Sequence, residues 1–276
     1  MSRIEKALEK AASMRKREGV EPAAAADQVS LSSPVMEPGK PSLDELLAAD
    51  PVAVANPKLV ALRDKNDIAF EEYNKLRSLI IKLTQGEKFS NTLMVTSCIG
   101  EEGKSLTSLN LAIALARGFD HTVLLVDTDF RRPTLHLSLG IKPETGLIQC
   151  LRDDLPISKA LIKTGIGKLV FLPAGGTVNK PVEMLGSKKM KEIINELKNR
   201  YPERYVIFDT PPVLPFADAQ VLAPEVDGLL FVVREGRTRL NDVKKALQTL
   251  QGSNMLGVVY NDAQVSMKNK SHYYYS

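Results

Sequence analysis

Residues 92–105, TLMVTSCIGEEGKS, decide the fold of this chain of 276 residues. The run TLMVTS (92–97) is apolar and rich in β-forming residues, which predicts a buried strand. The run SLTSLNLAIALARG (105–118) has helical apolar spacing and a final glycine, which predicts a helix and its end. The short loop between them closes with Gly103, Lys104 and Ser105. This order of strand, loop and helix predicts a phosphate-binding loop, or P-loop.

The loop carries the groups that bind the phosphates of a nucleotide. Backbone N–H groups and the helix N-terminus at such a junction point at phosphate oxygens. We expect Lys104 to neutralise the β- and γ-phosphates and the Ser105 hydroxyl to ligate Mg²⁺. Cys98 stands at the first position, where the simple pattern has glycine. The predicted nucleotide-binding residues of the loop are Gly100, Glu101, Glu102, Gly103, Lys104, Ser105 and Leu106.

Strands and helices alternate along the rest of the chain. Near-continuous runs of Val, Ile and Leu predict further strands at 121–127, 168–174, 204–209, 228–233 and 256–261. Helical patterns separate them, such as those at 188–201 and 240–252. Buried strands that alternate with helices are typical of a mostly parallel sheet with helices on both faces. The predicted fold is therefore an α/β P-loop NTPase.

Two of the predicted strands end in acidic residues. LLVDTDFRRP (124–133) places Asp127 and Asp129 beyond one strand, and VIFDTPP (206–212) places Asp209 beyond another. A single acidic residue at a strand end is often only a helix cap. Parallel sheets, however, bind ligands at the carboxyl ends of their strands, and there the three carboxylates would meet Lys104. We expect Asp209 to hold Mg²⁺, usually through water, with ATP as the nucleotide.

The chain divides into four predicted parts. Residues 1–18 have an apolar face of helical spacing, which predicts an amphipathic helix that docks on a membrane or a partner, or an ordinary solvated helix. Residues 19–49 are rich in Ala, Pro and Ser without an apolar period, which predicts a flexible linker. The catalytic-size domain is expected at 50–261 and a tail at 262–276. The tail holds Tyr273, Tyr274 and Tyr275, which have no core to pack against there.

Composition excludes several classes of function. No apolar run approaches the roughly 20 residues of a membrane-spanning helix, and no signal-peptide core is present, so we expect a cytoplasmic protein. The net charge of +4 comes without interleaved basic and aromatic residues, so nucleic acid is not an expected partner. The histidines and the two cysteines show no metal-ligand spacing. Cys98 leaves two hypotheses open, a redox switch with a thiol pKa lowered by the helix N-terminus, or a small residue that fills the loop.

Three motifs together resemble a known family. GEEGKS (100–105), LLVDTDFR (124–131) and VIFDTPP (206–212) resemble the Walker A, A′ and B motifs of the bacterial tyrosine kinases of capsule and exopolysaccharide synthesis, the BY-kinases. The terminal tyrosines resemble that family's phosphoacceptor cluster. The resemblance extends from about Phe70 to the end of the chain. The opening SRIEKALEKA is similar to stand-alone kinases of exosortase-linked exopolysaccharide systems.

The resemblance implies an ATP-dependent protein-tyrosine autokinase that regulates exopolysaccharide chain length or export. The implied catalytic residues are Lys104, Asp127, Asp129 and Asp209, with Mg²⁺ held by Ser105, Asp129 and Asp209. Asp127 would orient or deprotonate the incoming phenol, and a carboxylate helps most as the proton leaves. Arg131 would steady phosphate or substrate, or form a surface ion pair, and Asn261 would contact the adenine base. The implied acceptors are Tyr273, Tyr274 and Tyr275 of a neighbouring copy.

The resemblance also implies two kinds of partner. Family members carry an E-x-x-R-x-x-R motif that joins subunits into a ring, and EEYNKLR here supplies Glu71, Asn74 and Arg77. Asn74 replaces the central arginine and lacks its charged fork, so ring assembly is expected to be weak or to need a partner. The second implied partner is an inner-membrane polysaccharide chain-length regulator, whose cytosolic tail would activate the kinase at the membrane.

Two other functions remain open from the sequence. A division or partition ATPase shares the fold, but such proteins place a lysine five residues before the P-loop lysine, where this chain has Ile99. A catalytically silent ATP-binding regulator of polysaccharide assembly is the second, since P-loop motifs report binding more directly than turnover.

Overall fold

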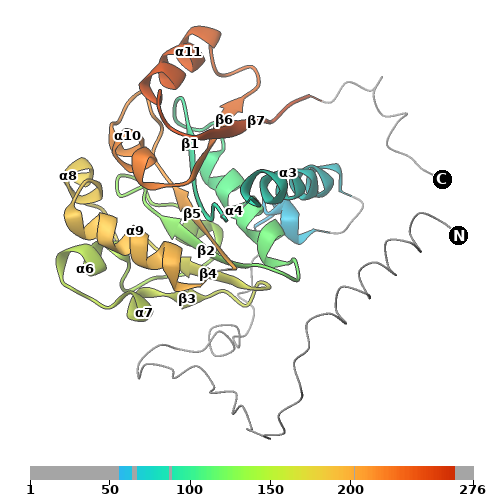
Figure 1. Ribbon diagram of the computed structural model, residues 1–276. Coiled ribbons are helices and arrows are strands. Elements are labelled where there is room, and N and C mark those ends of the chain that lie inside the picture. The colour runs from blue at the N-terminus through green and yellow to red at the C-terminus, as the bar shows by residue number, and fades with distance from the viewer. Residues whose placement is uncertain (1–55, 64–66, 87–88, 202, 265–276) are drawn as a thin grey trace, which may run out of the picture. The chain divides into compact units, whose positions relative to one another are not determined.

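The computed structural model of the protein describes residues 56–63, 67–86, 89–201 and 203–264 (Figure 1). All of them belong to the second of the two units into which the chain divides, Pro41–Ser276. The predicted amphipathic helix, the linker and the three terminal tyrosines lie outside the described residues. Within the described ranges, no helix is both long and apolar enough to cross a membrane.

Seven strands form one sheet, in the order β3-β4-β2-β5-β1-β6-β7. The strands are β1 (Thr92–Ser97), β2 (Thr122–Asp127), β3 (Ile162–Lys163), β4 (Leu169–Leu172), β5 (Arg204–Asp209), β6 (Gly228–Arg234) and β7 (Met255–Asn261). All neighbouring pairs are parallel except β3 with β4. The expected mostly parallel sheet is confirmed, with an antiparallel edge strand that the sequence analysis did not predict.

The helices vary in length. The longer ones are α3 (Ile68–Thr84), α4 (Lys104–Ala116), α9 (Lys188–Arg200) and α11 (Leu240–Thr249). The short ones are α5 (Leu135–Ser138), α6 (Leu147–Arg152), α7 (Ile157–Ala160), α8 (Pro181–Leu185) and α10 (Asp218–Leu222), with 3₁₀ turns η1 (Val60–Leu62) and η2 (Ala223–Glu225). Two of the longer helices begin at side-chain caps, where Asp67 and Ser187 accept backbone N–H groups and satisfy donors that the helix leaves free.

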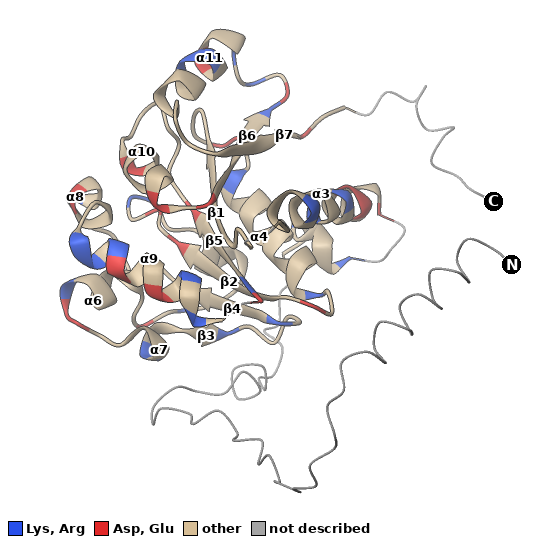
Figure 2. Cartoon of the chain, in the orientation of Figure 1, with Lys and Arg blue, Asp and Glu red and all other residues tan. Residues whose placement is uncertain are grey.

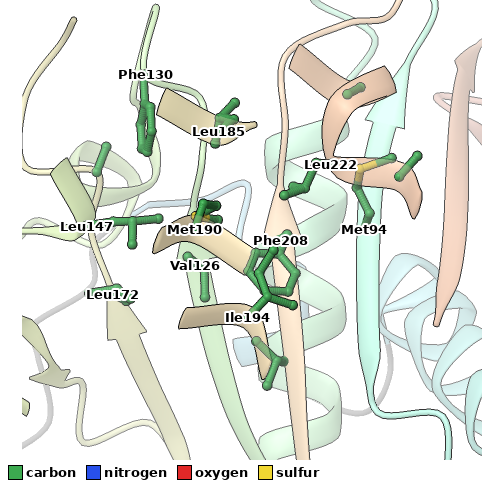
Figure 3. Packing of buried hydrophobic residues seen from close by; sticks show 14 of the residues in the cluster. Met94, Val126, Phe130, Leu147, Leu172, Leu185, Met190, Ile194, Phe208 and Leu222 are labelled. Carbon is green, nitrogen blue, oxygen red and sulfur yellow. The ribbon is translucent and has the colours of Figure 1, made fainter. Parts of the chain in front are cut away.

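Both faces of the sheet are covered, because alternate side chains of each central strand point to opposite sides. One hydrophobic cluster packs the sheet against α6, α9 and α10. Figure 3 shows part of it, with Met190 and Ile194 of α9 close to Phe208 of β5 and Val126 of β2. The other cluster packs the sheet against α4, and α3 lies against α4. Helix α4 is buried from Thr107 to Ala116, which explains its nearly continuous apolar sequence.

The topology brings the motifs to one edge. Strand β5 pairs with β1 on one side and β2 on the other. In these registers Asp209 lies opposite both Val95 and Asp127. The carboxyl ends of all three strands therefore meet where the loop after β1 leads into α4, which is the switch between neighbouring strands where such sheets bind ligands.

Candidate active site

Gly103 gives the P-loop its turn into α4. Its φ of 90° is left-handed, a conformation that favours glycine. A Cβ at this position would lie 2.1 Å from Nδ2 of Asn261, so the site has no room for a side chain. Thr107 N donates to the Gly103 carbonyl at 2.8 Å, which begins the hydrogen bonds of a helix of 13 residues. The N–H groups of its first turn have no partner within the helix and suit an anion, and their binding of phosphate stays a prediction.

Lys104 lies between the P-loop and the acidic strand ends. Its Nζ is 3.1 Å from Oδ2 of Asp129 and 3.1 Å from Oγ of Ser105. Burial alone would lower the pKa of this amine, but the carboxylates of Asp209 and Asp129 outweigh it and raise the pKa. Lys104 is therefore held protonated, as a group that binds phosphate must be.

Asp127 and Asp209 are both buried at the centre of the site. Asp209 accepts a hydrogen bond from Oγ of Ser108 at 2.9 Å. Asp127 accepts the backbone N–H of Asp129 at 3.1 Å through Oδ1, while its Oδ2 has no partner among the described residues. Burial, followed by repulsion from Asp209 and Asp129, raises the pKa of Asp127 well above its usual range. Burial likewise raises the pKa of Asp209.

These residues fit Mg·ATP. The unpartnered, buried Oδ2 of Asp127 is an acceptor that a proton donor or a metal-bound water would satisfy. Within the described part of the chain, no three His, Cys, Asp or Glu side chains are grouped so that they alone would hold a metal ion. Mg²⁺ keeps several waters and takes substrate phosphates with one or two protein oxygens. Ser105, Asp129 and Asp209 remain the residues predicted to hold it.

Arg131 forms an ion pair with an acidic residue of α10. Its guanidinium meets Asp218 through Nε, at 3.2 and 3.1 Å from the two carboxylate oxygens, and through Nη2 at 3.1 Å. Asp218 is fully buried on α10, and the guanidinium also lies 4.2 Å from the ring centre of Phe216. The structure thus gives Arg131 an ion pair that ties the loop after β2 to α10. Binding of ATP by Arg131 remains a prediction.

Asn261 lies at the P-loop, at the end of β7. Its Nδ2 donates to the backbone carbonyl of Glu102 at 2.9 Å. The side chain of Glu102 is fully buried, whereas Glu101 is exposed and has a positive φ of 65°. The contact of Asn261 with adenine stays a prediction. Its observed hydrogen bond to the Glu102 carbonyl helps to hold the P-loop in place.

Cys98 is buried at the start of the loop. Burial, with the charges of Glu102 and Asp242 beside it, raises the pKa of its thiol to about 12. The thiol therefore lacks the lowered pKa that a redox switch would use, because it is buried and has carboxylates rather than cations near it. The structure favours the second hypothesis, a small residue that fills the loop.

The residues predicted for self-association lie on α3. Nδ2 of Asn74 donates to Oε2 of Glu71 at 3.3 Å within the same helix. Nη1 of Arg77 donates to the carbonyl of Ala114 on α4 at 3.4 Å. Figure 2 shows acidic and basic residues along this helix. Glu71 is exposed, whereas Arg77 is partly buried against α4.

The sequence analysis missed three residues that support the site. Ser108 lies one helical turn after Lys104, so its hydroxyl is on the same face of α4 as the lysine. This spacing could have indicated that Ser108 belongs to the site. Asp218 looks like an ordinary first-turn acid of a helix. Thr238 follows β6 and donates to the Glu102 carboxylate, a contact between residues 136 positions apart that no local pattern reveals.

Comparisons with known proteins agree with this geometry. The CobQ/CobB/MinD/ParA nucleotide binding domain family matches residues 93–273. The chain is 33% identical over 218 residues to the tyrosine-protein kinase YwqD of Bacillus subtilis (strain 168), covering 78% of this chain and 90% of YwqD. It is 34% identical over 182 residues to the succinoglycan biosynthesis transport protein ExoP of Rhizobium meliloti (strain 1021), covering 64% of this chain and 23% of ExoP. The solved kinase domain of the Escherichia coli tyrosine kinase ETK is 28% identical, with a TM-score of 0.68, and the match covers 75% of this chain and 82% of that one.

Proposed function

Because this chain belongs to the family of bacterial tyrosine-protein kinases, within the CobQ/CobB/MinD/ParA nucleotide-binding domains, we propose that it transfers the γ-phosphate of ATP to the terminal tyrosines of a second copy. The observation that carries this proposal is the meeting of Lys104, Asp127, Asp129 and Asp209 at one edge of the sheet. The proposed acceptors are Tyr273, Tyr274 and Tyr275.

The proposed transfer breaks one bond and forms another. The phenol oxygen attacks the γ-phosphorus, and the bond from that phosphorus to the bridging oxygen breaks, so ADP leaves with the electron pair. Lys104 stabilises charge on the phosphoryl oxygens. Asp127 takes the phenol proton, and its raised pKa makes it a better proton acceptor than an ordinary carboxylate. Bound Mg²⁺ supplies charge neutralisation at the phosphates, and Ser105, Asp129 and Asp209 would hold it.

The family resemblance favours transfer to a neighbouring copy, because the length of the tail alone does not decide between the two sites. Eleven residues, 262–272, separate Asn261 from the first terminal tyrosine. Such a stretch spans at most about 36 Å, so it reaches either its own site or a neighbour's. Each phosphate adds a charge of about −1.5 to −2, so a fully modified tail carries roughly −5. The carboxylates of the site would repel it, and phosphorylation would then release the tail and loosen the assembly.

We further propose a role in exopolysaccharide production. The support is the family and the name of ExoP, a biosynthesis transport protein for succinoglycan. In this role an inner-membrane chain-length regulator activates the kinase through a cytosolic tail, and the kinase is cytoplasmic and peripheral to the membrane. The cycle of tail binding and release would set how long the polysaccharide assembly persists.

A mixing experiment tests the direction of transfer. One chain carries Lys104→Met with an intact tail, and the other is active but truncated after His272. After incubation with Mg·ATP, we expect phosphotyrosine on the Lys104→Met chain. Absence of label there, while the intact active chain labels itself, would overturn transfer between copies. Strong label on the truncated chain would show that the terminal tyrosines are not the main acceptors. Residual label is best sought at Tyr260, because its side chain is 57% exposed.

A further inference from the structure

Glu102 places a fully buried carboxylate inside the P-loop. Its two oxygens have different donors. Oε2 accepts the backbone N–H of Ile99 at 2.7 Å, which closes the loop on itself. Oε1 accepts the hydroxyl of Thr238 from the segment between β6 and α11. A buried carboxylate is stable only when such donors satisfy it, so the loop conformation depends on both.

The ends of β6 and β7 hold the same loop from outside. Asn261 donates to the carbonyl of Glu102 at 2.9 Å. Nη1 of Arg234 donates to the carbonyl of Glu101 at 3.3 Å, and Arg237 forms an ion pair of 2.7 Å with the Glu101 side chain. Residues 130 or more positions away thus contact two consecutive residues of the P-loop. Of these contacts, the bond between Thr238 and Glu102 is the one that involves a fully buried charge.

We propose that Thr238 and Glu102 are positioning residues that hold the P-loop in the conformation that binds nucleotide. This inference rests on the proposed ATP-dependent function. The carboxylate accepts from Ile99 and Thr238, so its oxygens are engaged within the protein and do not bind the nucleotide. With it fixed, the loop N–H groups that follow Gly100 and the turn at Gly103 keep their places before nucleotide arrives. Glu102 therefore acts through the loop and not by contact with ATP.

Removing the hydroxyl should cost nucleotide affinity. Valine has the shape of threonine but cannot donate, so Thr238→Val leaves Oε1 of Glu102 without its donor. The loop can then satisfy the carboxylate only by moving it toward water, and binding must reverse that movement. A lost hydrogen bond to a buried charge corresponds to about tenfold weaker binding. Thr238→Ser keeps the donor and should bind as the wild type does.

Glu102→Gln gives a second, graded variant. The amide oxygen can still accept the Ile99 N–H, and the amide nitrogen then faces Thr238. A threonine hydroxyl can also accept, so this contact survives with donor and acceptor exchanged. We expect binding within about threefold of wild type for Glu102→Gln, and a much larger loss when Thr238→Val is added, because the amide N–H then has no acceptor.

The test titrates each full-length variant with a fluorescent ADP analogue and Mg²⁺, and then measures KM and kcat for ATP. We expect Thr238→Val to raise Kd and KM about tenfold with kcat within about twofold, since it alters the loop before binding. Thr249→Val is the matched control, since it removes a threonine hydroxyl whose hydrogen bond, among the described residues, is to the Lys245 carbonyl within α11. A cooperative unfolding transition, measured without nucleotide, shows whether each variant is folded.

The outcomes separate this inference from the proposed function. A Kd equal to that of wild type in Thr238→Val would overturn the inference. If Thr238→Val alone does not fold, the same result in the double variant Glu102→Gln with Thr238→Val would overturn it. Equal losses in Thr238→Ser and Thr238→Val would overturn it too, because the hydroxyl would then be irrelevant. If Kd rises as expected but no variant, wild type included, phosphorylates tyrosine, the inference stands as one about nucleotide binding and the kinase proposal fails.

Discussion

At the scale of single residues, the site brings together carboxylates that repel one another. Asp127, Asp129 and Asp209 gather around one lysine, and Oδ2 of Asp127 has no partner among the described residues. Asp129 is the best compensated of the three, because it accepts from Lys104 and from the backbone N–H of Arg132 at 2.9 Å. Asp127 is the least compensated. Function here costs stability, as is usual for catalytic sites.

We therefore predict that Asp127→Asn stabilises the metal-free protein while it abolishes kinase activity. The folded pKa of Asp127 is raised above 3.8, so its contribution to stability is present below the unfolded pKa and is lost as pH rises through the folded one. The asparagine does not titrate. The variant should unfold like wild type at about pH 3, below the unfolded pKa, and be about 1 kcal/mol more stable at pH 8.

Urea unfolding at the two pH values, without Mg²⁺ or nucleotide, measures the difference. Asp129→Asn is the matched control and should lose stability at pH 8, because it weakens the contact with Lys104. A lower stability of Asp127→Asn than of wild type at pH 8 would show that the carboxylate is compensated after all.

At the scale of elements, long periodic segments were predictable and long-range polar contacts were not. The predicted strands at 92–97 and 204–209 are β1 and β5 with the same bounds, because each is an unbroken buried run. Strand β3 has only two residues, too few for a pattern. The meeting of Asp127 with Asp209 could be predicted from the parallel topology of the sheet. The pairing of Asp218 with Arg131 could not be predicted, because the two residues lie 87 positions apart.

The ion pair between Arg131 and Asp218 should contribute strongly to stability, because it joins the loop after β2 to α10. Asp218 is 0% exposed, so Arg131→Met leaves a buried carboxylate without its cation. Loss of one partner of a buried pair typically costs about 3 to 5 kcal/mol. We predict a loss of this order in the free energy of unfolding, measured in urea. The double variant Arg131→Met with Asp218→Asn should recover most of it, and a single variant within about 0.5 kcal/mol of wild type would contradict the assigned tie.

At the scale of the whole molecule, we predict that the surface of α3 governs whether copies assemble. Asn74 stands where the family's ring motif has arginine, and its amide bonds to Glu71 of the same helix. Several apolar side chains of this helix are also about half exposed, namely those of Ile68, Leu79 and Leu83. The helix therefore presents a mixed surface that lacks the charged fork of the family motif.

We predict that Asn74→Arg increases self-association. An arginine at this position can bridge to a carboxylate of a neighbouring copy, as a planar fork with several donors does. Light scattering over a concentration series should show a larger mass for the variant than for wild type. Asn74→Lys is the control, since it adds the same charge without the fork. Equal masses for Asn74→Arg and wild type would count against α3 as the assembly surface.

The claim that the chain is a protein-tyrosine kinase is tested most directly by the intact mass of the purified full-length protein after incubation with Mg·ATP, beside Lys104→Met treated in the same way. The account predicts that wild type gains phosphate on tyrosine, located by peptide sequencing to residues 273–275, and that Lys104→Met remains folded and gains none, because the cation at the γ-phosphate is gone. Nucleotide turnover by wild type without any gain in mass, or phosphotyrosine on Lys104→Met alone in solution, would contradict it.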